Sequence, residues 1–301
     1  MPVYGAEATL ERCLRSIQAQ TFANWELLAV DDGSPDRSGD ILDREAAKDG
    51  RIKVVHQSNG GVASARKAGL DRISGDYAIH IDPDDWVEPT MLEELVAEAK
   101  RTGAEMVLCD YFVDVNGKSQ CVQQRPSEFT ARALGRDLFQ RLHGSCCNKL
   151  ISSACYKAGH FYAGLNLSED LLYICEVLQT NPKIAYIPRA FYHYAISAGG
   201  GSMSSTYTAS RFRQLSTVYR RIDNLYAADK EMTSIVASEK AVYLGNVGAC
   251  SRDLSSAEFR ATLGKGARQR VWCSSASLPR RLMIILALSG FKTVIARILG
   301  R

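Results

Sequence analysis

The stretch Tyr77-Ala-Ile-His-Ile-Asp-Pro-Asp-Asp-Trp86 decides the fold that we expect for this chain. Its apolar first half, with β-branched residues at alternate positions, predicts a short buried strand. That strand ends in Asp82, Asp84 and Asp85 around a proline, which cannot continue a sheet ladder. Because residues i and i+2 of an extended segment point the same way, Asp82 and Asp84 are expected to face one ligand at the carboxyl edge of a sheet.

Two carboxylates that leave other ligand positions open suit Mg²⁺ or Mn²⁺ carrying a phosphate. An acidic turn in contact with water is the alternative, since Asp and Pro are also ordinary turn residues. Both interpretations stay open on these ten residues, and the rest of the chain has to separate them.

Size and composition indicate a globular protein. The 301 residues suffice for one α/β domain with an appended helical part, and the shares of hydrophobic (46%) and charged residues (23%) are ordinary. The net charge of +4 is concentrated, because residues 278–301 hold five basic residues and no acidic one. A nucleic-acid-binding protein would need a broader basic surface, so we expect no nucleic-acid partner.

The cysteines and the hydropathy pattern predict a cytoplasmic protein. The nine cysteines include no Cys-x-x-Cys pair, which favours reduced, buried thiols over a zinc module or a disulfide framework. No stretch approaches the roughly 18 apolar residues of a membrane span, and residues near Met1 lack the basic-then-apolar order of a signal peptide.

The first third of the chain alternates between helical and strand patterns. The spacing of apolar residues predicts, in order, a helix at 10–17, a strand at 25–30, a helix at 38–48, a strand at 52–56, a helix opened by Gly60 and Gly61, and the strand at 77–86. This alternation implies parallel strand pairing with crossovers.

Two features of this region point to a ligand. The strand at 25–30 also runs into acids, Asp31 and Asp32, so two strands end in carboxylates. Arg66 lies about one turn into the glycine-started helix, where a cation can reach a diphosphate near the helix start. A surface arginine on an ordinary helix is the alternative for Arg66.

The later part of the chain predicts further elements. We expect a helix at 91–99, a strand at 106–112, a hairpin turn at Asn116-Gly117, a helix at 130–142, strands at 183–187 and 191–194, a glycine-rich loop at 197–205 and two or more helices within 206–260. The basic, apolar end at 278–301 is too short to span a bilayer but can lie on an anionic one, and a helix docked on the domain is the alternative.

The motifs taken together resemble family 2 glycosyltransferases of the GT-A fold. The resemblance rests on Pro2-Val3-Tyr4, Val30-Asp31-Asp32-Gly33-Ser34, Asn59-Gly60-Gly61 to Arg66, and Asp82-Pro83-Asp84-Asp85-Trp86, which follow that family's order and spacing. It covers residues 2 to about 204. It implies an α/β fold with a mostly parallel sheet flanked by helices, and an inverting enzyme that uses a nucleotide-sugar donor.

The resemblance also implies roles for single residues. Tyr4 and Asp32 would lie at the base, usually uracil, and Arg66 near the nucleotide. Asp82 and Asp84 would form the DxD element that holds the ribose and the diphosphate bound to Mn²⁺ or Mg²⁺.

The catalytic element is expected at Ser168-Glu169-Asp170. Ser168 can cap a helix that begins at Glu169, and acids in the first turn suit its positive end, so the residues alone favour a structural cap. The resemblance reverses this preference and implies that Asp170, beside Glu169, is the catalytic base. Asn148-Lys149-Leu150 matches the segment that commonly precedes this element, which makes Lys149 a further candidate.

His193 is the remaining candidate site residue. It could contact the diphosphate or the metal, but a histidine flanked by aromatic residues is more often packed and hydrogen-bonded.

One departure from the family concerns the start of the sequence. Family members usually carry an apolar strand of about five residues immediately before the Pro-Val-Tyr motif. Where that strand is lacking, neighbouring sheet edges are left unpaired and apolar surface is exposed. Because this would weaken both stability and donor binding, a catalytically impaired donor-binding remnant is one alternative function.

The sequence therefore predicts an inverting, metal-dependent hexosyltransferase of cell-surface polysaccharide or glycan synthesis. Residues 1–204 would form the GT-A domain, with a donor half to about 110 and an acceptor half at about 111–204, and 205–301 a helical region. The partners would be a UDP-sugar, a glycan or lipid-linked acceptor, and the inner membrane surface through 278–301. A metal-dependent nucleotidyltransferase and a metal-free glycoside hydrolase are the other rivals.

Overall fold

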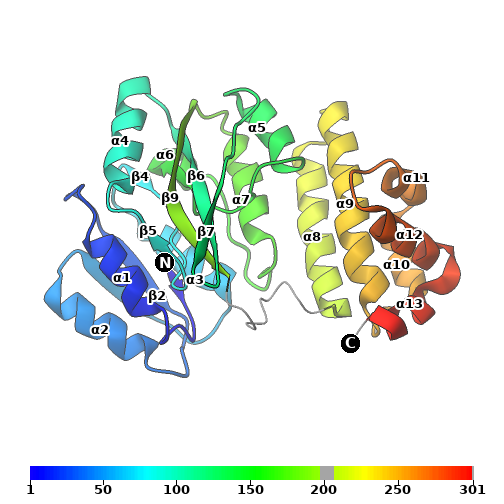
Figure 1. Cartoon of the computed structure of the whole chain (residues 1–301), viewed down its shortest axis with the longest axis horizontal. Coiled ribbons are helices and arrows are strands. Elements are labelled where there is room, and N and C mark those ends of the chain that lie inside the picture. The colour runs from blue at the N-terminus through cyan, green and yellow to red at the C-terminus, as the bar shows by residue number, and fades with distance from the viewer. Residues whose placement is uncertain (197–206, 300–301) are drawn as a thin grey trace. The chain divides into compact units, whose positions relative to one another are not determined.

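The computed structural model describes residues 1–196 and 207–299 (Figure 1). The chain divides into two compact units, Met1–Gly200 and Gly201–Arg301. The predicted glycine-rich loop at 197–205 lies outside the described residues.

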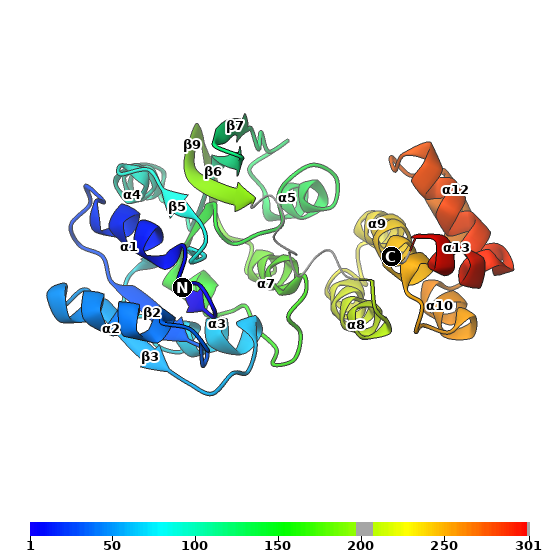
Figure 2. The ribbon, with the colours of Figure 1, turned by 60° about the horizontal axis from the view of Figure 1, so that its bottom comes forward.

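The first unit begins with three parallel strands connected by helices. Its elements up to residue 70 are β1 (Pro2–Val3), α1 (Leu10–Gln18), β2 (Leu27–Asp31), α2 (Ser38–Lys48), β3 (Ile52–His56) and α3 (Val62–Leu70). The strands pair in the order β1-β2-β3, all parallel. Helix α2 packs against β3 while α3 packs against β1 and β2 (Figure 2). The predicted parallel pairing is therefore confirmed for these strands.

A second sheet follows, in which most neighbouring strands are antiparallel. Its strands are β4 (Tyr77–Ala78), β5 (Trp86–Val87), β6 (Met106–Val115), β7 (Lys118–Val122), β8 (Lys149–Ser152) and β9 (Ile184–Ile196). They pair in the order β4-β8-β6-β9-β5, with β7 on β6, and β6-β9 is the parallel pair. The accompanying helices are α4 (Met91–Thr102), α5 (Ala131–Leu138), α6 (Ser153–Tyr156) and α7 (Glu169–Leu178).

The prediction of one strand over 77–86 is wrong. Only Tyr77–Ala78 and Trp86–Val87 are strands, and they pair antiparallel with β8 and β9 instead of continuing the parallel sheet. Between them the chain turns, because the backbone N–H of Asp85 donates to the carbonyl of Asp82 over 3.2 Å. Pro83 stands second in this turn, a position for which the fixed φ of proline is suited. Asp82 and Asp84 therefore share a turn and not one face of a strand.

The hairpin prediction is confirmed, and the β9 region differs in detail. Asn116 and Gly117 both have positive φ, 51° and 75°, as a two-residue hairpin turn requires. The two strands predicted at 183–187 and 191–194 are one strand, β9, whose pairing with β6 is shifted near Cys109 and Asp110. The shift lets one strand continue where the sequence pattern is interrupted.

The hydrophobic core of the first unit explains why α1 and α4 form. Helix α1 buries Leu10, Cys13, Leu14 and Ile17, the stripe that its spacing predicts, and α4 buries Met91, Leu95, Val96 and Ala99. Both sets belong to one cluster with residues of the sheets. Because these helices are fixed by packing, the strand ends and turns that carry the polar residues are held in place.

A cleft of about 550 Å³ lies beside β1 and β4. These two are the terminal strands of their sheets, and residues of both line the cleft. Three side-chain atoms of lining residues are buried without a hydrogen-bond partner in the described structure, namely Trp25 Nε1, Arg66 Nε and His80 Nε2.

The second unit is helical in its described part. Its elements are α8 (Ala209–Leu225), α9 (Lys230–Cys250), α10 (Ser256–Leu263), α11 (Ala267–Trp272), α12 (Leu278–Leu286), the π-helical turn η2 (Ala287–Phe291) and α13 (Lys292–Leu299). Helix α9 lies at the centre and contacts α8 and α10 to α13 (Figure 2). None of the helices in the described ranges has the length and apolar character needed to cross a bilayer.

Candidate active site

The end of β2 holds the loop that starts α3. The carboxylate of Asp32 is buried and accepts hydrogen bonds from the backbone N–H of Gly60 at 2.9 Å and of Gly61 at 2.8 Å, and from Gln57 Nε2 at 2.7 Å. A carboxylate that accepts several N–H groups is well satisfied in a buried position. Asp32 therefore fixes the backbone just before the helix that carries Arg66.

Gly61 is needed at the start of α3. Its φ is +85°, and a Cβ at this position would lie 2.4 Å from the side-chain nitrogen of Asn166. Asn166 also accepts a hydrogen bond from the backbone N–H of Ala63. The segment before α7 is thus packed directly on the first turn of α3, which only a glycine permits.

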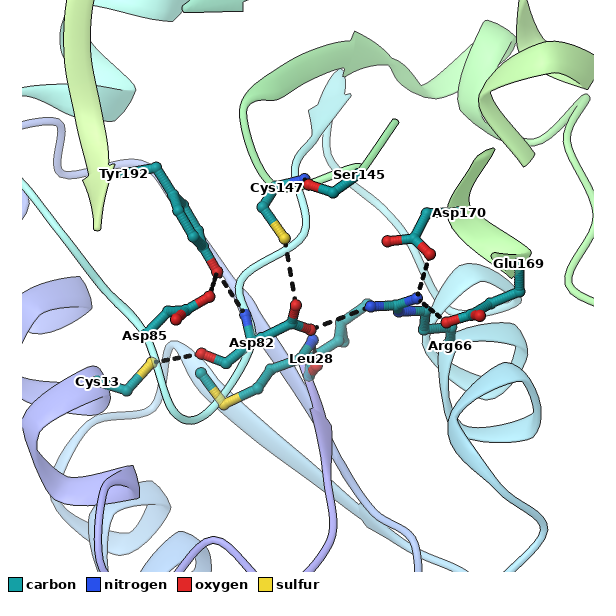
Figure 3. A network of polar contacts seen from close by, with 11 residues as sticks. Cys13, Leu28, Arg66, Asp82, Asp85, Ser145, Cys147, Glu169, Asp170 and Tyr192 are labelled. Atoms are coloured by element: carbon teal, nitrogen blue, oxygen red, sulfur yellow. Dashed lines mark hydrogen bonds and ion pairs between the residues drawn. The ribbon is translucent and has the colours of Figure 1, made fainter. Parts of the chain in front are cut away.

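Arg66 joins three carboxylates from two distant parts of the chain. Its guanidinium lies 3.2 Å from Asp82 Oδ1, 2.5 Å from Glu169 Oε1 and 3.4 Å from Asp170 Oδ1. Figure 3 shows the guanidinium between Asp82 on one side and the two acids at the start of α7 on the other. The side chain of Arg66 is only 5% exposed, so these contacts are made largely out of water.

The charges in this cluster shift the pKa values of its members. Burial lowers the pKa of Arg66, but the charges of Asp170, Asp82 and Glu169 outweigh burial and hold that pKa well above its usual value. Burial, followed by the charge of Asp170, raises the pKa of Glu169 to about 7, although Arg66 opposes the shift. One arginine therefore does not neutralise the surrounding carboxylates completely.

The turn at 82–85 is held by residues from several elements. The Asp82 carboxylate accepts a hydrogen bond from Cys147 Sγ at 3.3 Å, and its backbone N–H donates to the Tyr192 hydroxyl at 3.1 Å. The same hydroxyl donates to Asp85, which also accepts from the backbone N–H of Ala195 (Figure 3). Burial raises the pKa of Asp85 to about 8. Asp85 is thus a structural anchor for the turn.

Asp82 and Asp84 of this turn lie close enough for the charge of one to affect the other. Burial and then the charge of Asp82 raise the pKa of Asp84, and no side chain in the described ranges donates a hydrogen bond to the Asp84 carboxylate. Among the described residues, no three His, Cys, Asp or Glu side chains are grouped closely enough to hold a metal ion by themselves. A pair of carboxylates that leaves most ligand positions to water and a phosphate is the arrangement that Mg²⁺ accepts.

The start of α7 differs from the predicted cap. Helix α7 begins at Glu169 as expected, and Ser168 occupies the N-cap position, but its φ is +54° and its side chain makes no capping hydrogen bond. Ser168 therefore does not provide the side-chain cap that was the structural alternative to a catalytic role for these acids. The left-handed backbone at Ser168 instead accompanies two acids that both point to Arg66 (Figure 3).

The other predicted site residues lie apart from Arg66 or serve the backbone. Tyr4 follows β1 and is 54% exposed. His193 is buried between Asp114 and Glu88, with both ring nitrogens 2.9 Å from a carboxylate, and stacks on Trp86. This is the packed, hydrogen-bonded arrangement that we considered as the alternative for His193.

Lys149 is fully buried and holds the loop at 143–148. Its Nζ donates to the carbonyls of His143 and Ser145 and to Asn148 Oδ1, at 2.6 to 2.9 Å. Burial lowers the pKa of Lys149 to about 8. This loop includes Cys147, which contacts Asp82. Lys149 therefore supports the 82–85 turn through the loop and without contacting the turn itself.

The contacts of Cys147, Tyr192 and Asn166 are not predictable from the sequence motifs. Each reaches the site from a different loop or strand, and the contacts follow from packing and not from a local motif. The Tyr-rich strand at 191–194 and the Asn-Lys-Leu segment were the signals that could have indicated the first two.

The fold is that of glycosyltransferases of the GT-A type. The chain belongs to glycosyl transferase family 2, whose family model matches residues 1–158. The putative glycosyltransferase EpsH of Bacillus subtilis is 31% identical over 206 residues, which cover 64% of this chain and 59% of that protein. A cholesterol galactosyltransferase of Borreliella burgdorferi is 27% identical over 227 residues, 71% of this chain and 63% of that protein.

Solved structures show the same fold. S. aureus TarS 1-349 superposes with a TM-score of 0.70 at 18% identity, covering 99% of this chain and 88% of that one. A complex of that protein with UDP-GlcNAc has a TM-score of 0.69. A mannosyltransferase from Pyrobaculum calidifontis, solved with GDP-Man and Mn²⁺, has a TM-score of 0.57 at 14% identity and 85% coverage of that chain. In sequence, the matched region spans from about a third to three fifths of the curated relatives.

Proposed function

We propose that this protein transfers a sugar from a UDP-sugar to an acceptor hydroxyl, with inversion at the anomeric carbon, in the synthesis of a cell-surface glycan. The observation that carries the proposal is the contact of Arg66 with Asp82, Glu169 and Asp170, because it joins residues of the motifs for which the resemblance implies nucleotide binding and catalysis. Membership of glycosyl transferase family 2 supports it.

The donor would bind between the first strands and the 82–85 turn. Tyr4 is exposed and can stack on a base, while Asp32 holds the Gly60–Gly61 backbone over which the nucleotide would lie. The guanidinium of Arg66 carries the positive charge suited to a diphosphate. Family neighbours that were solved with UDP-GlcNAc, UDP and GDP-Man support a nucleotide-sugar as the donor.

Asp84, with Asp82 beside it, would hold the Mn²⁺ or Mg²⁺ that accompanies the diphosphate. The cation would supply positive charge against the negative charge that develops on the departing UDP. The elevated pKa of Asp84 supports this assignment, because a carboxylate in a negative surrounding gains most from a bound cation.

Asp170 would act as the base that takes the proton of the acceptor hydroxyl. Glu169 is the less suitable of the two acids, since its side chain is 9% exposed and lies 2.5 Å from Arg66. The Asp170 side chain is 20% exposed and lies 3.4 Å from the same guanidinium. Asp170 is thus both more accessible and less tightly paired, as a proton acceptor must be.

We further propose that residues up to about 110 bind the donor and that about 111–204 bind the acceptor, a glycan or a lipid-linked sugar. The tilted rings of Tyr111, His143 and Tyr194, with centroids 5.2 and 6.1 Å apart, offer apolar ring faces to a sugar on the acceptor side. The enzyme would work at the inner membrane surface, with residues 278–301 as its membrane contact.

Replacing Asp170 by Asn tests the proposal. The Asp170→Asn protein should bind UDP with Mn²⁺ as the wild type does and lose transfer by a factor of about 10³, within the range typical for removal of a general base. UDP binding is measured by calorimetry and transfer by UDP release from a panel of UDP-sugars. Asp71→Asn, at an exposed acid near the end of α3, is the matched control and should keep full activity.

Four results would contradict parts of this proposal. Near-normal turnover by Asp170→Asn would exclude it as the base. Release of pyrophosphate from a nucleoside triphosphate would indicate a nucleotidyltransferase, and hydrolysis of an oligosaccharide that chelators do not inhibit would indicate a glycoside hydrolase. An unaltered melting temperature with UDP and Mn²⁺ would indicate that the donor is not bound.

A further inference from the structure

Helix α12 presents a row of exposed leucines. Leu278, Leu282 and Leu286 stand four residues apart, which places them along one side of the helix, and they are 51%, 44% and 47% exposed. Trp272, at the end of α11, is 53% exposed. We call these four residues the α12 face. A cluster of large apolar side chains left in water marks an interaction surface more often than a single exposed leucine does.

The other side of α12 is already packed. Ile284 is fully buried and lies against Gly245 of α9, where an added Cβ would meet the isoleucine at 2.6 Å. Ala287 and Leu288, which follow the helix, are also buried. The α12 face is therefore not the side by which this helix packs on its own unit, because Ile284 on the other side makes that contact.

The segment that carries the α12 face is basic, although Glu239 of α9 lies near enough to Arg280 to feel its charge. Residues 259–301 contain nine Lys or Arg and no Asp or Glu. Arg260, Lys265, Arg268 and Arg280 are exposed among them. The guanidinium of Arg281 lies 5.8 Å from the ring centroid of Trp272 and donates to its carbonyl, so a cation is held beside the aromatic ring.

We propose that the α12 face docks flat on an anionic lipid bilayer, with Trp272 and the three leucines in the headgroup boundary. Apolar residues on one side of a helix, a tryptophan at its edge and basic residues nearby are the features of a helix that lies in the membrane interface. Charge complementarity selects this occupant, because a second copy of the face would bring one acid-free basic segment against another. The inference deepens the membrane partner in the proposed function and rests on it for its biological purpose.

Vesicle flotation of the full chain, without donor or acceptor, tests the docking. Binding to phosphatidylcholine vesicles with about one third phosphatidylglycerol should exceed binding to pure phosphatidylcholine by at least about twentyfold, and raising NaCl from about 0.1 M to about 1 M should remove most of this preference. The Leu282→Ser/Leu286→Ser protein should bind anionic vesicles at least about tenfold more weakly, because the apolar contribution is lost. Arg280→Gln should cost a factor of about five.

The matched control removes two exposed apolar side chains elsewhere. Val115→Ser/Phe129→Ser, both in the first unit, should bind vesicles as the wild type does. Circular dichroism and the melting temperature check that each variant is folded.

Four outcomes would overturn the docking proposal. Three of them are equal binding to neutral and anionic vesicles, no vesicle binding, and unchanged vesicle binding of Leu282→Ser/Leu286→Ser. The fourth is a wild-type protein that does not bind vesicles but forms a dimer in light scattering, where Leu282→Ser/Leu286→Ser abolishes that dimer. The last result would assign the face to a second copy of the chain. UDP release is measured separately on soluble acceptors, so a failure of docking and a failure of sugar transfer remain distinguishable.

Discussion

Arg66 is the residue on which the site depends. Removing Arg66 and three carboxylates from water costs desolvation free energy. Once the cluster is formed, loss of the Arg66 side chain would leave Asp82, Glu169 and Asp170 without a counter-charge. Arg66, Asp82, Glu169 and Asp170 are predictable from motifs that lie up to about a hundred residues apart, because each motif is recognisable locally. The partners of Asp82, namely Cys147 and Tyr192, depend instead on how distant strands pack.

The pKa of Glu169 predicts a pH dependence of stability. In the folded protein this pKa is about 7, against an ordinary value of 4.5, so the folded state keeps the proton to higher pH than the unfolded state does. Stability must therefore fall as the pH rises from about 4.5 to about 7. Glu169→Gln cannot titrate, and its free energy of unfolding relative to the wild type should rise by about 3 kcal/mol between pH 4.5 and pH 8.

Urea unfolding at several pH values measures this difference. Any constant loss from the missing contact with Arg66 cancels when the two pH values are compared. Glu93→Gln, at an exposed position of α4, serves as the control. A difference between Glu169→Gln and the wild type that stays constant with pH would show that Glu169 titrates normally.

At the scale of elements, predictions were right where one local rule acts alone. Helix α2 begins and ends where the periodicity indicates, and the Asn116-Gly117 turn follows from the positive φ that both residues tolerate. The prediction of one strand over 77–86 is wrong because two signals compete in this stretch. Its β-branched residues favour a strand, but Pro83 and the hydrogen bond across Asp82 and Asp85 form a turn, and the flanking pieces pair with strands that come much later in the chain.

Gly61→Ala should weaken the start of α3 strongly. The substitution combines a positive φ with a contact of 2.4 Å to Asn166, so Asn166 must move and release its hydrogen bond to Ala63. We expect a loss of about 3 kcal/mol in the free energy of unfolding, together with weaker UDP binding, because strain and lost packing add.

Gly5→Ala is the matched control for this element. Gly5 also has a positive φ, +62°, but a Cβ there would meet nothing within 4 Å. Its loss should be about 1 kcal/mol, the contribution of backbone strain alone. Similar losses for both variants would mean that the contact with Asn166 carries no energy. Thermal and urea unfolding of the two proteins decide this.

At the scale of the whole molecule, the order of motifs identified the fold although it left much of the topology open. The family resemblance predicts a GT-A fold, and the comparisons confirm the family and the fold. The arrangement of β4 to β9 could not be read from the sequence, since antiparallel and parallel neighbours are decided by contacts between residues far apart in the chain.

UDP and a divalent cation should stabilise the protein together. A ligand that binds only the folded state at about 100 times its dissociation constant adds about 2.7 kcal/mol, so UDP with Mn²⁺ should raise the melting temperature by several degrees and EDTA should reverse this. Differential scanning fluorimetry measures the shift. Asp84→Asn should fold normally and lose the part that depends on Mn²⁺, whereas Asp43→Asn, an exposed acid on α2, should retain it. A shift that survives EDTA would argue against the cation.

The cleft beside β1 and β4 has a consequence for what it can take up. Among the described residues that line it, Trp25, Arg66 and His80 each keep one buried polar atom without a hydrogen-bond partner. Because a buried polar atom without a partner costs free energy, water or another polar molecule that reaches these atoms should be bound there in preference to an apolar one.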